Sequence, residues 1–488
     1  MATLDERNHP NGKGSGLVSA LAGRSSRYLL LYGGTLLLAV VLGAVVAYSE
    51  RFGGDNGPYM LLGALLAIAV AVAILLQWRL GAILLVAALP FDAALSFGPG
   101  ASGIRALALV TFVSFALALL TDRELFERFV RLWQQPLALA VLAFVLWISA
   151  SILWASYKGD ALRTTLTFLG LLGLMVVVGS LERRYLVLAW TVLAFSAALS
   201  VPAGYILPVP EGSFMAVSGR FGPGGATPNS YACDMEIVFI VAYFGLLGRD
   251  RKHRIIAYLL APVFLYGIFA TESRTGLIAL VATPLLGLVV PQLAARLGWR
   301  ILPVYVLGAA ALVVIVLAIP SVGESAVERY MTLSQVQSEQ TWSGRWSTWQ
   351  GALKLTASHP ILGVGAGNFS EAAMNYSASV VAHTSKREEV TGLTHDIWLS
   401  VASELGLVGL ILFLGIVFFL FKTAVPIAQR SDLGTGILLG LIVFVIAGMT
   451  LPWQDHKMVY VLFGSVLALQ LHNSARRAPS VGKHEGKS

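Results

Sequence analysis

Long apolar runs recur along almost the whole chain, and they constrain its fold more than any other feature. A helix that crosses a bilayer needs about 20 mostly apolar residues. Fourteen segments approach this length: residues 28–48, 58–76, 80–97, 103–120, 136–154, 162–180, 185–205, 231–247, 254–271, 275–292, 301–320, 403–421, 433–450 and 457–472. Pro90 and Asp92 make 80–97 the weakest of them. The pattern predicts an all-α polytopic integral membrane protein.

Composition excludes a large soluble domain. Charged residues make up 12% of the 488, against about 25% in soluble proteins. The longest mostly polar stretch is 321–394, between the eleventh and twelfth predicted spans. The one cysteine, Cys233, excludes an intrachain disulfide framework, and Cys–His zinc spacings are absent. We therefore expect no metal and no cofactor.

Basic residues predict the orientation of the spans. With the N-terminus inside, the inner segments hold 22 of the 34 Lys and Arg residues. This bias places both termini in the cytoplasm and supports an even number of spans. It also explains the net charge of +8 without a nucleic-acid partner. The polar tail 1–27 has no cleavage site near a short apolar core, so no signal peptide is predicted.

Three polar regions then face outward: 206–230, 271–276 and 321–394. Arg220 and Asn229 lie in the Gly- and Pro-rich end of the first, where Asn229 can cap the next helix. Arg274 lies between two apolar segments with almost no loop, where an unpaired charge is costly. An arginine there suits phosphate binding, although it could also pair with Glu272 or reach lipid headgroups.

Tryptophans mark a helix inside the large loop. Trp342, Trp346, Trp349 and Leu353 are spaced to share one helical face, which suits a helix lying in the membrane interface. Arg345 borders this face and would sit at headgroup depth. The alternative is an ordinary interfacial helix with a peripheral arginine.

The end of the large loop carries two further motifs. Glycines at 363, 365 and 367 permit a close backbone approach to a ligand, and no Walker lysine follows them. His395 stands where the chain re-enters the membrane and can accept a proton near neutral pH. On a continuous helix Glu404 would face away from His395, which favours a structural role.

Some polar residues have weaker signals. Asp234 and Glu236 lie in the eighth predicted span, where they could pair with arginines or relay protons. The polar residues 453–457 predict a turn at the outer face.

Together these motifs resemble the O-antigen ligase family, which includes O-antigen polymerases. The resemblance rests on Thr271 to Gly276, on Gly344 and Arg345 with the tryptophans after them, on 359–367, and on His395 with Leu399, Glu404, Gly406 and Gly409. The stretch from Arg220 to Asn229 is similar to a further family segment, so the likeness covers mostly 218–409.

The resemblance implies a GT-C-like fold of about twelve spans in a bacterial inner membrane, and a metal-independent inverting glycosyltransferase. It implies a periplasmic site where Arg274 and Arg345 bind the diphosphate of an undecaprenyl-diphosphate-linked glycan. His395 would be the catalytic base, and Arg220, Asn229, Trp349 and Gly365 would contact substrate. The acceptor would be lipid A-core or a growing glycan. Asp396 departs from the family, since many members have Asn there.

We therefore expect four regions. Residues 1–27 form a cytoplasmic tail, 28–205 the N-terminal transmembrane helices, 206–450 the ligase-related catalytic region, and 451–488 the last span with a basic cytoplasmic tail.

The main alternative within this family is an O-antigen or exopolysaccharide polymerase. A membrane transporter is an alternative of another class, which intramembrane Asp234 and Glu236 would suit, although no repeated halves are visible. A scaffold for envelope assembly is the third, and it predicts that charge substitutions in the outer loops are harmless.

Overall fold

The computed structural model describes residues 57–96, 102–207, 209, 220–246, 251–289, 340–373 and 394–477, with isolated positions between 294 and 314. Side chains of 57–62, 251–254, 340–345, 347 and 475–477 are outside this description. The predicted span 28–48, the tail 1–27 and most of 301–339 and 374–393 also lie outside the described residues.

The described residues form helices and no strand, which confirms the prediction of an all-α protein. The long helices are α2 (Gly57–Leu76), α3 (Trp78–Ala87), α4 (Gly103–Thr121), α5 (Arg123–Trp133), α6 (Pro136–Ala150), α7 (Lys158–Gly179), α8 (Arg183–Ala203), α10 (Pro228–Ile240), α11 (Arg251–Ala270), α12 (Arg274–Val289), α16 (Gln340–Ser358), α19 (Ile397–Ala428), α20 (Asp432–Gly448) and α21 (Lys457–Arg477). Short elements are η2 (Leu89–Phe91), η3 (Ser151–Leu153), η4 (Pro223–Gly225), the π-helix η5 (Val241–Leu246), α17 (Phe369–Ala373) and η8 (Trp453–Asp455).

Five of the described helices are long and apolar enough to cross a membrane: Gly103–Thr121, Pro136–Leu153, Lys158–Gly179, Arg183–Ala203 and Ile397–Ala428. Five shorter apolar helices accompany them: Gly63–Leu76, Trp78–Ala87, Ile255–Ala270, Arg274–Val289 and Asp432–Gly448. The predicted span 80–97 is divided, because α3 ends at Ala87 and η2 follows with Pro90. The predicted loop 121–135 instead contains α5, whose first turn is capped by the Asp122 carboxylate accepting from the Leu125 N–H at 3.0 Å.

The chain divides into two compact units. The first holds α2, the start of α3 and residues 109–126. Its helices are joined by the Ser114 hydroxyl, which donates to the Ile74 carbonyl at 2.6 Å, and by an edge-to-face contact of Trp78 with Phe115. The second holds 82–108 and the chain from 127 onward, and it contains all the candidate site residues.

In the second unit α21 packs on α7, α19 packs on α6 and α20, and α20 packs on η5 and α10. Small residues permit these close approaches, as in many membrane helix pairs. A Cβ on Gly464 of α21 would lie 2.7 Å from the Met175 carbonyl of α7. The indole N–H of buried Trp190 donates to the Ser465 hydroxyl at 2.9 Å, so α8 and α21 are also joined.

Helix α19 is broken near its start, and a loop fills the break. Gly406 has φ 66° and ψ −168°, a conformation essentially restricted to glycine. The Leu407 N–H donates to the Pro360 carbonyl at 2.8 Å instead of to its own helix. The N–H groups of Val364 and Gly365 donate in turn to the carbonyls of Ser403 and Glu404 at 3.1 and 2.8 Å. The loop 360–368 therefore supplies the partners that the broken helix lacks.

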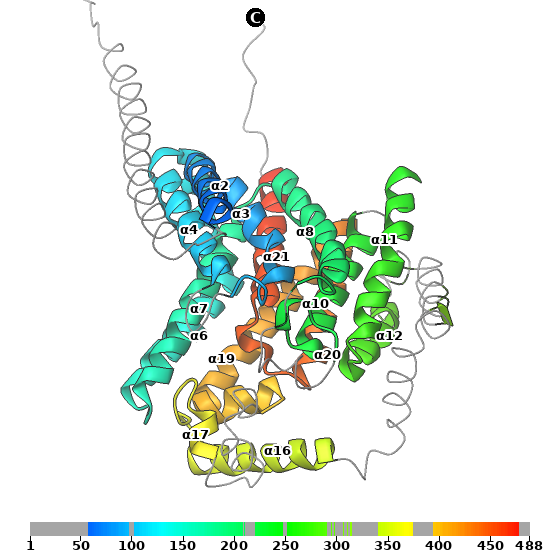
Figure 1. The fold of residues 1–488 in the computed structure, drawn as a ribbon. Helices are drawn as coiled ribbons and strands as arrows, with labels where there is room; N and C mark the ends of the chain where they lie inside the picture. Colours follow the sequence, from blue (N-terminus) through cyan, green and yellow to red (C-terminus); the bar gives the residue numbers. More distant parts are fainter. Residues whose placement is uncertain are drawn as a thin grey trace, which may run out of the picture. The chain divides into compact units, whose positions relative to one another are not determined.

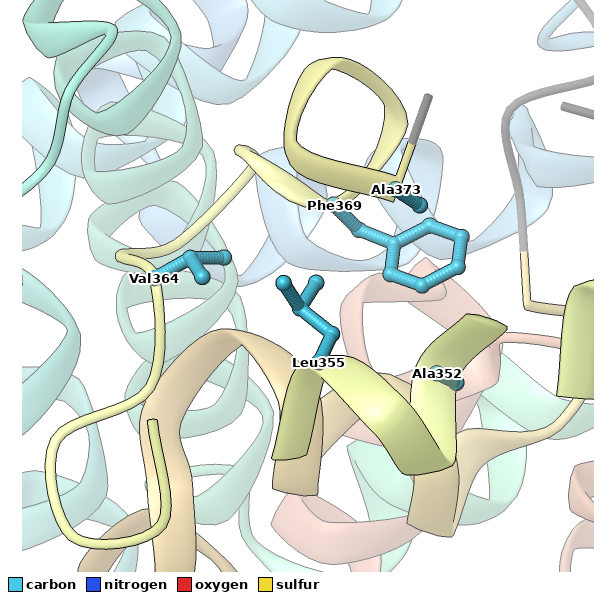
Figure 2. Close-up of a cluster of buried hydrophobic side chains, with 5 residues drawn as sticks. All are labelled: Ala352, Leu355, Val364, Phe369 and Ala373. Atoms are coloured by element: carbon cyan, nitrogen blue, oxygen red, sulfur yellow. The ribbon is translucent and has the colours of Figure 1, made fainter. Parts of the chain in front are cut away.

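Helix α16 runs across the end of the bundle at which α19 begins (Figure 1). Its buried face carries Ala352 and Leu355, which pack with Val364, Phe369 and Ala373. Figure 2 shows Leu355 pointing into the space between Val364 and Phe369. This small core joins α16, the loop and α17.

The exposed face of α16 matches the predicted tryptophan stripe only in part. Trp346 and Leu353 are 51% and 56% exposed, so this face is apolar and open. Trp349 is half-buried at its border, and the side chain of Trp342 lies outside the described residues. An apolar face of this kind suits an interfacial helix.

We predict that Gly406→Ala destabilises the protein by about 1–3 kcal/mol, because a side chain there is strained. The added Cβ would also lie 2.2 Å from the Ile361 carbonyl oxygen. The measurement is the thermal unfolding midpoint of the purified protein in detergent. Gly415→Ala is the matched control in the same helix, because no atom lies within 4 Å of its Cβ position. An equal midpoint for Gly406→Ala and wild type would contradict this account.

Candidate active site

A cavity of about 420 Å³ opens at the end of the second unit where α19 begins. Its wall comes from α6, α7, residues 227–230, the loop 366–370, residues 394–405 and the turn 451–456. The predicted site residues Asn229 and His395 both line it. Segments from 148 to 456 thus converge on one space that has the size of a small-ligand site.

His395 is held in an unusual backbone conformation, with φ at 52°. On one side the Trp349 indole N–H donates to the Thr394 carbonyl at 2.9 Å. On the other the Asp396 carboxylate caps α19 by accepting from the Leu399 N–H at 2.8 Å. Left-handed residues other than glycine cost about 1–3 kcal/mol and gather at functional sites. The fold therefore fixes this histidine at the cavity wall.

Trp349 has a role that the sequence did not predict. It was expected to contact substrate, but its indole N–H binds the protein backbone next to His395. It is also absent from the cavity wall as the described residues outline it. We interpret Trp349 as the residue that ties α16 to the His395 segment.

Arg220 lies behind Asn229 instead of in the cavity. It is 5% exposed, and its Nη2 donates to the Asn229 Oδ1 at 2.8 Å. Its Nε donates to the Thr271 carbonyl at 3.0 Å, so one guanidinium joins the 220–229 segment to the turn before α12. The planar fork of arginine suits such a double contact. Arg220 orients Asn229, which does line the cavity.

The glycines of the loop are used for packing against the protein. Gly363, Gly365 and Gly367 have φ values of 68°, 98° and 71°. A Cβ on Gly365 would lie 2.5 Å from the Ala155 Cβ, and one on Gly367 would lie 2.4 Å from the Thr164 Oγ1. The close approaches in the structure are therefore to the protein itself: Gly365 meets the turn between η3 and α7, and Gly367 meets α7. Of these glycines, only Gly367 lines the cavity.

Glu404 anchors the same loop. Its carboxylate accepts from the N–H groups of Gly367 and Phe369 at 3.0 and 3.3 Å. Glu404 and His395 line the same cavity, although a continuous helix would place them on opposite faces. The reason is that His395 precedes α19 with non-helical φ, so helical periodicity does not relate the two residues.

The family comparison matches the part of the chain that contains this loop. A family model described as O-Antigen ligase covers residues 237–414. Residues 237–414 belong to the O-antigen ligase family. The match confirms the resemblance inferred from the motifs, and this family suggests membrane glycan transfer in polysaccharide biosynthesis. No curated protein matches the chain.

The matched region also holds Arg274 and Arg345, which were predicted to bind the diphosphate. Arg274 is the first residue of α12. The turn before it is fixed by the Thr271 hydroxyl, which donates to the Ile268 carbonyl at 2.6 Å, and by Glu272 with φ 52°. Arg274 does not line the cavity as the described residues outline it. Arg345 lies on α16, and its side chain is outside the description.

Three cavity residues fall beyond the O-antigen ligase region and were missed as site residues: Gln454, Asp455 and His456. The Gln454 Nε2 donates to the Ser400 hydroxyl at 2.8 Å, and the His456 ring stacks on Trp453 at 4.6 Å. Burial, helped by the charge of Lys457, lowers the pKa of His456 to about 3, so the ring is neutral at physiological pH. A run of polar residues between two spans was their only signal, and it was interpreted as a turn.

No three His, Cys, Asp or Glu side chains lie together as metal ligands among the described residues.

We predict a pH-dependent effect of Asp396→Asn. Burial raises the pKa of the Asp396 carboxyl, although hydrogen bonds from the Leu399 and Trp398 N–H groups lower it. The folded chain then keeps a proton that the unfolded chain loses above about pH 3.9, so stability falls as pH rises through this range. Asparagine keeps the cap without the charge. The variant should be more stable than wild type near neutral pH, and the difference should shrink in acid.

The measurement is the unfolding midpoint of both proteins across a pH series in one detergent. A difference that grows as the pH falls would contradict the assignment.

Proposed function

We propose that the protein transfers a glycan from an undecaprenyl-diphosphate carrier to an acceptor hydroxyl at the periplasmic face of a bacterial inner membrane, as an O-antigen ligase. The observation that carries the proposal is His395, held at φ 52° on the wall of the cavity of about 420 Å³ within the O-antigen ligase region. In this proposal 206–450 is the catalytic region, extended by the cavity turn 451–456. Residues 28–205 support it, and both termini are cytoplasmic.

The reaction replaces one bond at the anomeric carbon with another. The acceptor oxygen bonds to that carbon, the bond to the diphosphate oxygen breaks, and the configuration inverts. His395 takes the hydroxyl proton as the general base. Its neighbours Thr394 and Asp396 are fixed by hydrogen bonds, so the imidazole is positioned before substrate binds.

The leaving diphosphate gains negative charge as its bond breaks. Fixed cations in a partly dry site stabilise such charge strongly, without a metal ion. We assign this role to Arg274 and Arg345. Arg274 begins a helix directly after an apolar one, where we expect it at the depth of the lipid headgroups. Arg345 belongs to α16, which runs across the end of the bundle (Figure 1).

Ligase and polymerase differ in the acceptor, and one experiment separates them. Deleting the gene of a ligase leaves long polymer on the carrier lipid, whereas deleting that of a polymerase leaves single repeat units. We expect long polymer. Unchanged surface glycan, or solute uptake by vesicles without glycan transfer, would contradict the enzyme assignment.

We predict that His395→Asn lowers the transfer rate by about 100-fold or more, because the general base is lost. Asparagine tolerates the left-handed conformation, so the backbone should be retained. The measurement is glycan transfer in proteoliposomes that contain the lipid-linked donor and an acceptor. His359→Asn is the matched control, since His359 is exposed and its Nδ1 contacts the hydroxyl of the neighbouring Ser358. Full activity of His395→Asn would overturn the assignment.

We predict that Arg274→Lys lowers the transfer rate about 10- to 100-fold, because lysine keeps the charge but loses the bidentate hydrogen bonds to phosphate. The same assay measures it. Arg184→Lys is the control, because Arg184 is 75% exposed and stacks on Tyr185 away from the cavity. Equal rates for Arg274→Lys and wild type would exclude a bidentate contact in the rate-limiting step.

A further inference from the structure

A second cavity of about 420 Å³ adjoins the first. Both cavities are lined by Thr227, Ser230, Asp455 and His456, so these four residues form a common wall. The second cavity is completed by η2, by the 225–226 backbone, by Asp234 on α10 and by Lys457 at the start of α21. None of its lining residues was predicted to be a substrate site.

The charges of this cavity disfavour an anion. Lys457 is the one Lys or Arg among its described lining residues, and its ammonium is paired with the Asp92 carboxylate. Asp234 and Asp455 add two more carboxyl groups, and His456 is neutral. A diphosphate would meet three carboxyl groups there and, among the described lining residues, no unpaired Lys or Arg to bind it.

Two buried polar atoms in the wall lack a hydrogen bond in the structure: Asp234 Oδ1 and His456 Nδ1. They face each other at 3.5 Å, which is longer than a good hydrogen bond. Buried polar groups without partners are rare and point to a missing partner such as a ligand or water. Stacking on Trp453 fixes the plane of the His456 ring, so its nitrogens have defined directions.

The remaining polar groups are those that recognise hydroxyls. A carboxylate accepts from an O–H, and a neutral imidazole with one protonated nitrogen accepts at the other. The hydroxyls of Thr227 and Ser230 both donate and accept. A cavity of this volume holds far more than one water, whose share of liquid volume is about 30 Å³.

The geometry points to the second cavity as a binding subsite for a neutral, hydroxyl-rich group, a sugar unit, held by Asp234, His456 and Ser230 beside the His395 cavity. This inference rests on the proposed function, because a glycosyltransferase needs such a subsite next to its base. The two parts of the substrate would then lie in different places: the sugar among carboxyl and hydroxyl groups, and the diphosphate with the arginines outside this wall.

Direct binding tests this subsite without relying on transfer. The probes are neutral disaccharides (maltose, lactose and N,N′-diacetylchitobiose), observed by saturation-transfer NMR on the purified full chain in detergent. We expect at least one to bind, and inorganic pyrophosphate not to displace it. Asp234→Asn should weaken binding by up to about tenfold, the range for the loss of one hydrogen bond.

Glu236→Gln is the matched control, because it makes the same chemical change two residues away in α10 and Glu236 lines neither cavity. Thr227→Val is a second variant in case Asp234→Asn fails to fold. Thr227 caps α10 without a side-chain hydrogen bond, so its hydroxyl can be removed without loss of a cap. We expect this change to weaken binding about threefold.

The outcomes separate the two proposals. Disaccharide binding that Asp234→Asn and Thr227→Val weaken supports the subsite, even if no transfer is found and the proposed function fails. Glycan transfer by the wild type with disaccharide binding that both variants leave unchanged overturns the subsite and leaves the function standing. Displacement by pyrophosphate, or no binding of any disaccharide, also overturns it.

Discussion

The break in α19 at Gly406, and the loop that fills it, is the interaction on which the site depends. Backbone groups inside a membrane protein must find partners within the protein. Here the carbonyls of Ser403 and Glu404 accept from the loop, and that of Leu405 accepts from the Trp147 indole N–H at 3.0 Å. The short segment 397–405 is therefore held at a fixed place, apart from the long membrane helix that follows. His395 and the cavity wall are positioned by that short segment.

The same loop is bound on its other side to the N-terminal helices. The Asn368 side chain accepts from the Tyr157 N–H at 2.7 Å, and the Ala366 N–H donates to the Ser151 hydroxyl at 3.0 Å. Asp396, Thr394 and Trp349 then fix the last turn of chain before α19. Because His395 is already positioned, the reaction includes no entropy cost for ordering it.

The all-α membrane fold was predictable because long apolar segments leave a direct mark in the sequence. His395 could be selected as a cavity residue from its place at a membrane boundary, and the O-antigen ligase region from local motifs. The contacts that build the site could not be predicted. Trp147 meets Leu405, and Tyr157 meets Asn368, across more than 200 residues, and no local pattern encodes such pairs. For the same reason the packing of Gly365 on Ala155 could not be predicted.

The hydrogen bonds that join the loop to Ser151 and Tyr157 also limit which segments of this protein can be exchanged with those of a relative. The matched family region spans 237–414, yet Trp147, Ser151 and Tyr157, which complete its loop, lie almost a hundred residues earlier. A chimera that transplants the family region alone would deprive the Leu405 carbonyl, the Ala366 N–H and the Asn368 side chain of these partners. A functional chimera therefore has to carry the α6–α7 corner together with the loop, so these two distant segments form one unit of exchange.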